Sequence, residues 1–162
     1  MDMPRIKAVT PQAGTMLNIE WQNGTRSSVN LIGWIATGGD LLAPLKSEAI
    51  WQTATVEDFG ATIEWAGDDL AIDAYHLSQI AEDQRSYTGE DLAKWQDELV
   101  LSNNEAADLV GVSLRTWKNY KAGQDISDAI KIILCASRRD PLIMHAHYRP
   151  RTAGRPRASS AI

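Results

Sequence analysis

The segment from Leu101 to Gly123, LSNNEAADLVGVSLRTWKNYKAG, constrains the fold of this 162-residue chain more than any other stretch. It predicts two short helices joined by a tight turn. Asn103 or Asn104 can cap the first helix, because a short polar side chain there accepts a hydrogen bond from a free backbone N–H. Gly111 is expected to end that helix, since glycine takes the left-handed conformation without strain. Ser113 is a suitable N-cap for the second helix.

The second predicted helix has two unlike faces. Trp117 and Tyr120 fall on one side, which predicts that this side packs against the rest of the protein. The opposite side carries two cations and two hydrogen-bonding groups, from Arg115, Thr116, Lys118 and Asn119. Such a face favours a helix-turn-helix that enters the major groove of DNA. The alternative is a helical hairpin with no role in nucleic-acid binding, and the basic outer face argues against it.

The segment also follows a pattern known from other proteins, L-T-Q-x-x-x-A-x-x-L-G-V-S-x-x-T-I-x-x-W-E-x-G. Direct matches to this pattern are Leu101, Ala107, Gly111, Val112, Ser113, Thr116 and Gly123. Related residues stand at five further positions, namely Ser102, Asn103, Val110, Trp117 and Tyr120. On these residues the segment resembles the Xre or Cro/C1 (lambda repressor-like) helix-turn-helix family. Lys121 departs from the pattern, because a cation stands where the family has glutamate.

The resemblance implies an all-α domain of several short helices that binds double-stranded DNA as a homodimer. Leu114 and Arg115 open the second helix and are expected to lie closest to the bases. Arg115 is the best candidate to bind guanine, since its guanidinium matches the O6 and N7 acceptors, and Leu114 could touch a thymine methyl. Lys118, Asn119 and Lys121 suit phosphates or secondary base contacts. The predicted DNA-binding residues of this segment are Asn103, Ser113, Leu114, Arg115, Thr116, Lys118, Asn119 and Lys121.

The formal net charge of −5 conceals a strong asymmetry along the chain. Residues 1–86 carry a net charge of −7, whereas residues 113–162 carry +7. Attraction to phosphate depends on the local field more than on total charge. The acidic half is therefore expected to face away from DNA.

The first half of the chain predicts short strands at 5–9, 16–21, 25–31, 53–56 and 62–65. Asn23-Gly24 favours a hairpin turn, because both residues tolerate positive φ. Residues 33–39 break the strand pattern, and residues 43–50 suit a loop or a short helix. Residues 74–84 predict a helix that buries Tyr75, Leu77 and Ile80. The fold class expected is α+β: a small, mostly antiparallel-sheet domain followed by the all-α helix-turn-helix domain.

Three short motifs follow one another along this first half of the chain. They are Val9-Thr10-Pro11, Leu42-Ala43-Pro44-Leu45 and Ile63-Glu64-Trp65-Ala66-Gly67-Asp68-Asp69-Leu70. On these motifs residues 4–75 resemble a bacterial family catalogued as a domain of unknown function, DUF2442. The resemblance implies a fold and no chemistry, because the family has no agreed activity.

The predicted domains are residues 1–84, residues 88–148 and a basic tail at 149–162. Thr88 and Asp91 have the spacing of a capping box that starts a helix after a polar linker. A further helix is expected at 126–139, stopped by Asp140-Pro141. The tail is expected to be disordered by itself. Its Arg155 and Arg157 flank a proline as in the minor-groove AT-hook motif, although a solubilising tail with non-specific phosphate contacts is the reading we favour.

No constellation of residues in the sequence predicts catalysis, so we expect no enzyme and no cofactor. His145 and His147 are two imidazoles without the further ligands that a metal site needs. Cys135 cannot form an internal disulfide and is expected in the core. No export signal or membrane span is apparent, and a reducing cytoplasm is the expected location.

The sequence therefore predicts a sequence-specific DNA-binding protein, a transcriptional regulator that represses its targets or its own gene. In this interpretation the α+β domain dimerises, senses an effector or binds a partner protein. The alternative is a protein-interaction module, such as an antitoxin-like partner protein, in which DNA binding is secondary or lost.

Overall fold

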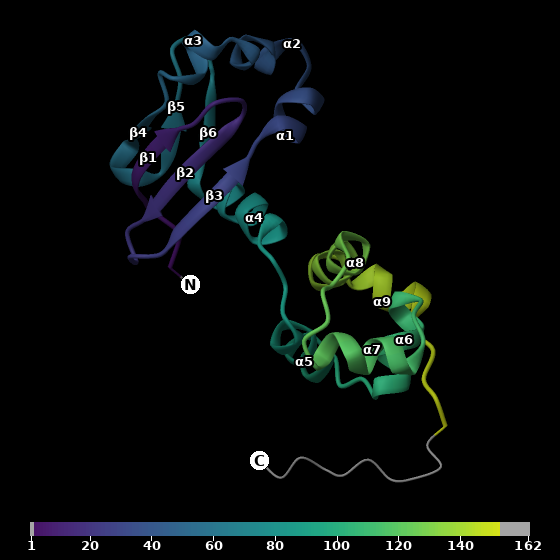
Figure 1. The fold of residues 1–162 in the computed structure, drawn as a ribbon. Coiled ribbons are helices and arrows are strands. Elements are labelled where there is room, and N and C mark those ends of the chain that lie inside the picture. Colours follow the sequence, from purple (N-terminus) through teal and green to yellow (C-terminus); the bar gives the residue numbers. More distant parts are fainter. Residues whose placement is uncertain (1, 153–162) are drawn as a thin grey trace. The chain divides into compact units, whose positions relative to one another are not determined.

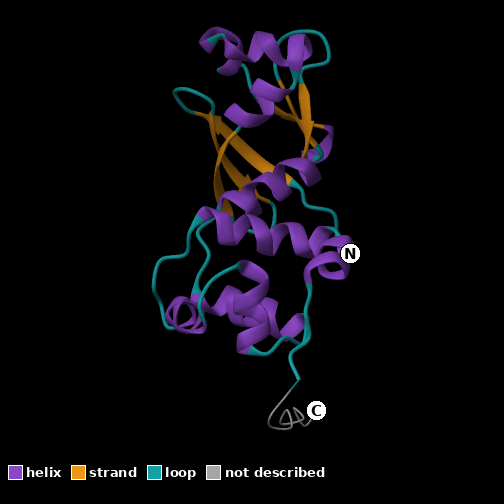
Figure 2. Ribbon diagram, turned by 90° about the vertical axis from the view of Figure 1, so that its right-hand side faces the viewer, coloured by secondary structure: helices purple, strands orange, loops and turns teal. Residues whose placement is uncertain are grey.

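The computed structural model describes residues 2–152, and the chain divides into two compact units, Met1–Arg85 and Ser86–Ile162 (Figure 1). Each unit has its own cluster of buried apolar side chains. The first unit contains both sheets, and all regular structure in the described part of the second unit is helical (Figure 2). The fold class is α+β, as predicted. Arg155 and Arg157 lie outside the described residues.

The first sheet is an antiparallel meander of β1 (Ile6–Pro11), β2 (Met16–Trp21) and β3 (Arg26–Asn30). Alternate residues of β2 point into the core, so Leu17, Ile19 and Trp21 are buried. A hairpin turn is present where it was predicted, and the Trp21 N–H donates to the Thr25 carbonyl at 2.9 Å; of the Asn-Gly pair, however, only Gly24 adopts a positive φ, of 89°. These three strands confirm the strands predicted at 5–9, 16–21 and 25–31.

The second sheet, β4 (Thr55–Glu57), β5 (Thr62–Glu64) and β6 (Ala71–Asp73), is also antiparallel. The strands β4 and β5 lie where the sequence predicts them, whereas β6, which pairs with β5, was not predicted. The segment between the sheets is mostly helical. It contains α1 (Ile32–Thr37), α2 (Gly39–Leu42), the 3₁₀ helix η1 (Ala43–Lys46) and α3 (Glu48–Trp51), with a second 3₁₀ turn, η2 (Asp58–Gly60), between β4 and β5.

Helix α4 (Ala74–Gln84) has the bounds that the sequence predicts. Asp73 caps it by accepting the His76 N–H at 2.8 Å. Its buried side runs through Ala74 and Leu77 to the half-buried Ala81, the spacing of one helical face. Tyr75 lies about a quarter turn away and is 51% exposed, so the expectation that it is buried is wrong.

A stack of indoles holds the core of the first unit together. Trp51 is fully buried, and its ring lies 5.3 Å from that of Trp65, which in turn lies 6.1 Å from Trp34. The Trp51 indole N–H donates to the carbonyls of Gln12 and Met16 at 3.1 and 3.2 Å. The irregular segment of helices is thereby fixed to the turn between β1 and β2.

The second unit consists of α5 (Gly89–Glu98), α6 (Asn103–Val110), α7 (Leu114–Lys121), α8 (Asp128–Arg139) and α9 (Pro141–His147). Thr88 and Asp91 form the predicted capping box at the start of α5. Asp140 and Pro141 stop α8 and open α9, also as predicted. The centre of the core is formed by Leu92, Trp95, Ala106, Trp117 and Leu134.

Candidate nucleic-acid interface

The N-cap of α6 is Ser102, one residue before the caps proposed from sequence. The Ser102 hydroxyl accepts the Glu105 N–H at 3.1 Å, and the Glu105 carboxylate accepts the Ser102 N–H at 2.9 Å. This is a complete capping box, so the assignment of the cap to Asn103 or Asn104 is wrong. The signal was present in the sequence as Ser-x-x-Glu.

The turn between α6 and α7 has the predicted geometry. Gly111 adopts a left-handed φ of 76°, and the Val112 N–H donates to the Ala107 carbonyl at 3.0 Å. Ser113 caps α7 by accepting the Thr116 N–H at 3.1 Å, and its own hydroxyl lies 2.9 Å from the Thr116 hydroxyl. The two helices and the turn are therefore local structures that their own residues specify.

The inner face of α7 is fixed by Trp117. Its side chain is fully buried, and its ring packs edge-on against Trp95 of α5 at 5.8 Å. Its indole N–H donates to the Gln96 side-chain oxygen at 2.9 Å. Trp117 thus combines a large apolar contact with a directional hydrogen bond to the neighbouring helix.

Gln96 is a buried amide that joins three segments of the second unit. Its oxygen accepts from Trp117 and from the Lys121 ammonium at 3.0 Å, while its nitrogen donates to the Leu101 carbonyl at 3.0 Å. Sequence reasoning missed this residue, because a glutamine in a polar helix gives no sign that it is buried. The amide therefore sets where α7 lies relative to α5.

Lys121 and Asn103, both predicted to contact DNA, are brought together by the same network. The Lys121 ammonium donates to the Asn103 side-chain oxygen at 2.9 Å, and both residues are half-buried. They connect the end of α7 to the start of α6. One of the three N–H donors of Lys121 has no partner in this network.

A close backbone approach completes the contact between α5 and α7. A Cβ atom placed on Gly89 would lie 2.4 Å from the Lys121 carbonyl oxygen. Only glycine leaves room for this contact, so the first turn of α5 rests directly on the last turn of α7.

The outer face of α7 presents unpaired polar groups. Arg115, Lys118 and Asn119 are exposed, and within residues 2–152 their side chains make no hydrogen bond or ion pair. Ser113 at the turn is also exposed, whereas Leu114 and Thr116 are half-buried beside them. The structure thus brings six of the predicted site residues onto one surface, which we call the α7 outer face: Ser113, Leu114, Arg115, Thr116, Lys118 and Asn119.

The chain after α9 is bound to α6 by two acids one turn apart. The Tyr148 hydroxyl donates to Glu105 at 2.6 Å, and the Arg151 N–H donates to the same oxygen at 3.2 Å. The Arg151 guanidinium makes a bidentate pair with Asp108 at 2.7 and 2.8 Å. Arg151, which belongs to the tail predicted at 149–162, is thus bonded to α6 through both its backbone and its side chain.

The environment of Glu105 favours its charged form despite burial. Burial by itself would raise the pKa of this carboxyl, but hydrogen bonds from Tyr148, Ser102 and the Arg151 backbone outweigh burial and lower the pKa to about 2. For the exposed Asp108, the hydrogen bond from Arg151 is the main cause of a lowered pKa. Both carboxylates are therefore negatively charged at neutral pH.

The cysteine and the two histidines considered in the sequence analysis form no further site among residues 2–152. The Cys135 sulfur is buried and lies 3.0 Å from the Tyr87 hydroxyl. His145 and His147 are exposed on α9, and no group of three metal-binding side chains occurs among residues 2–152. In the same part of the chain, no helix has the length and apolar character needed to cross a membrane.

Neither a family model nor a curated protein matches this chain. A crystal structure of a candidate DNA-binding protein from Nitrosomonas europaea is similar to it, with 22% sequence identity, a TM-score of 0.47 and 98% of each chain covered. The function of the present chain therefore has to be inferred from the geometry of its own residues.

Replacing Gln96 with leucine should destabilise the second unit, although the volume of the side chain at this position stays nearly the same. The Trp117 N–H and the Leu101 carbonyl would be left buried without a partner, at a cost of about 1–3 kcal/mol. Urea unfolding followed by tryptophan fluorescence measures this loss. Gln124→Leu on the exposed loop after α7 is the matched control and should leave the midpoint unchanged; equal effects of both changes would show that Gln96 is not a structural hub.

The stability of the second unit should depend on pH through Glu105. Its pKa in the folded state is about 2, below the ordinary value of 4.5, so its stabilising effect is full above pH 4.5 and is lost as the pH falls toward 2. Thermal unfolding at several pH values should show this loss, and Glu105→Gln should flatten the profile in this window. An unchanged profile in the variant would mean that other acids account for it.

Proposed function

We propose that the second unit binds double-stranded DNA, with α7 as the recognition helix in the major groove, and that the protein is a transcriptional repressor or autoregulator. The observation that carries the proposal is the unpaired state of the cations on the α7 outer face. A helix that served only to pack would gain nothing from leaving these groups without partners.

Other cations of the second unit give the contrast. Lys94 and Arg138 both lie within 4.0 Å of Glu98, and Lys131 lies 3.6 Å from Asp128. Arg151 is paired with Asp108. In the described helices of the second unit the cations without a partner are thus Arg115 and Lys118, both on the α7 outer face, and such a concentration of free positive charge is the electrostatic footprint of a DNA-binding surface.

Roles follow from position on the helix. Arg115 lies in the first turn of α7, where a recognition helix contacts base edges, and its guanidinium suits guanine. Leu114 supplies an apolar contact for a thymine methyl. Lys118 and Asn119, one turn further on, suit phosphates, and the exposed Ser113 and half-buried Thr116 can add hydrogen bonds to the backbone. Lys121 and Asn103 act mainly by positioning α7, with one remaining N–H of Lys121 free for a phosphate.

The proposal includes a homodimer, because helix-turn-helix proteins usually bind two half-sites. The side chains of Ile132 and Leu142 are 64% and 66% exposed on α8 and α9, so they are candidates for its interface. The same two side chains favour the second candidate function, an interaction module that binds another protein. We assign no enzymatic role.

Binding to the protein's own upstream DNA and to a scrambled duplex, measured by fluorescence anisotropy at several salt concentrations, tests the proposal. Arg115→Ala should cost about 1–3 kcal/mol, confined to one base pair of the specific site. Lys118→Ala should weaken binding to every sequence and lower the salt slope by about 1. Lys94→Ala, on the exposed side of α5, is the control and should change neither quantity.

Absence of binding even at low salt would overturn the DNA proposal and favour the interaction module. Binding that none of these substitutions alters would place the DNA on another surface.

A further inference from the structure

The first sheet has an unpaired edge at β3. The order β1-β2-β3 leaves β3 paired on one side only, with β2. An unpaired strand edge presents backbone N–H and C=O groups that can pair with another extended chain.

The register of the hairpin identifies the free groups. Trp21 bonds Thr25, and the Leu31 N–H donates to the Thr15 carbonyl. In an antiparallel pair hydrogen-bonded residues alternate with non-bonded ones, so Ser27 and Val29 direct their backbone groups toward β2. Arg26, Ser28 and Asn30 direct theirs outward.

Asn30, the last residue of β3, already has a partner for its outward backbone groups. The Asn30 N–H donates to the Gln84 side-chain oxygen at 2.8 Å, and the Gln84 side-chain nitrogen donates to the Asn30 carbonyl at 2.7 Å. The amide of Gln84 thus imitates one residue of an added strand. Within residues 2–152 the outward groups of Ser28 and Arg26 have no such partner.

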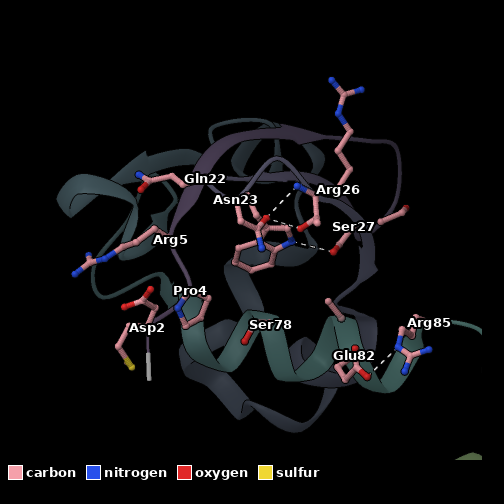
Figure 3. Close-up of a pocket in the computed structure, with 15 residues that line it drawn as sticks. Asp2, Pro4, Arg5, Gln22, Asn23, Arg26, Ser27, Ser78, Glu82 and Arg85 are labelled. Atoms are coloured by element: carbon pink, nitrogen blue, oxygen red, sulfur yellow. Dashed lines mark hydrogen bonds and ion pairs between the residues drawn. The ribbon is translucent and has the colours of Figure 1, made fainter. Parts of the chain in front are cut away.

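Open space flanks this edge on both faces of the sheet. On one face a cavity of about 900 Å³ lies between the β2–β3 hairpin and α4, and Figure 3 shows Ser27 on the hairpin side and Ser78, Glu82 and Arg85 on the helix. On the other face a hollow of about 500 Å³ extends across all three strands, over Ala8 and Thr10 of β1, Asn18 and Glu20 of β2, and Arg26 and Ser28 of β3. An extended backbone can therefore approach in the plane of the sheet, with room for side chains on either face.

The charges across the outer face indicate what kind of strand would fit. Lys7 of β1 pairs with Glu20 of β2 at 2.9 Å, and Glu20 lies directly opposite Arg26 of β3. The pKa of Glu20 is lowered, chiefly by the hydrogen bond from Lys7 and in smaller part by the charge of Arg26. The signs alternate along this row, so a fourth strand would place an acid opposite Arg26.

We propose that the groove between β3 and α4 binds an extended segment of a partner protein, which adds to the sheet beside β3 as a fourth strand. The segment pairs its backbone with Ser28 and Arg26. It carries an aspartate or glutamate opposite Arg26, a small polar residue opposite Ser28, and side chains that enter the cavity beside α4. This is peptide recognition by strand addition, in which the backbone supplies affinity and alternate side chains supply specificity.

Selection of a phage-displayed random octapeptide library on the full-length protein tests the proposal. The expected result is a set of enriched peptides that share an acidic residue at one position. Synthetic copies of the enriched peptides should bind Ser28→Ala as they bind the parent, because alanine keeps the backbone N–H. Ser28→Pro removes that N–H and should weaken binding by about tenfold.

Proline is tolerated at position 28 because the N–H there faces away from β2. The matched substitution is Arg26→Glu, which should weaken the binding of the acidic peptides. Peptides in which the acidic residue is changed to lysine should bind this variant again. A peptide N-methylated at a residue that faces the edge should also lose binding, whereas N-methylation of the next residue should not. This pair of peptides keeps the test valid even if Ser28→Pro fails to fold.

Three results would overturn the proposal. Absence of any enriched peptide would mean that the edge binds no added strand and that the charge of Arg26 serves to prevent such pairing. Equal binding of the peptides to Ser28→Pro and Ser28→Ala, with both N-methylated forms bound, would place the peptides elsewhere. The third result is that the protein forms a dimer, that this dimer does not bind the peptides, and that Ser28→Pro dissociates it. In that case the strand that pairs with β3 would come from a second copy of this chain.

Discussion

The buried amide of Gln96 is the interaction on which the second unit depends. It is the shared partner of Trp117, Lys121 and the Leu101 carbonyl, and so it ties α5 to α7 and to the loop that precedes α6. A buried polar group is stabilising only when all its hydrogen bonds are made, which restricts α7 to one position. The missing side chain of Gly89 reinforces that position by letting the two helices touch. The outer face of α7 is therefore presented on a rigid support.

Electrostatic pairing divides the surface of the second unit into satisfied and unsatisfied charges. Glu105 and Asp108 hold the chain after α9 through Tyr148 and Arg151, so these acids neutralise a cation that could otherwise contact phosphate. Within residues 2–152 the cations of the α7 outer face form no ion pair. Because long-range attraction depends on such uncompensated charge, the pairing pattern is more informative than the net charge of −5.

The first unit contains two three-stranded sheets with short strands, which depend on contacts between distant segments for their stability. Its stacked indoles and the bonds from Trp51 to two carbonyls join segments that are far apart in sequence. The amide pair between Gln84 and Asn30 closes one end of the β3 edge and leaves the rest open. A strand edge next to a helix thus follows from packing alone, without any motif that marks it.

The sequence by itself determined the structures that short-range forces specify. Asn23-Gly24 set the hairpin, Gly111 and Ser113 set the turn and the start of α7, and alternation along β2 set its buried face, because each effect acts within a few residues. Tertiary structure alone decided which polar residues are buried and which charges are paired. Gln96, the bond between Lys121 and Asn103, and the binding of Arg151 to α6 join segments distant in sequence, and β6 forms only because β5 offers it a partner. Such contacts depend on three-dimensional proximity, which neither periodicity nor composition encodes.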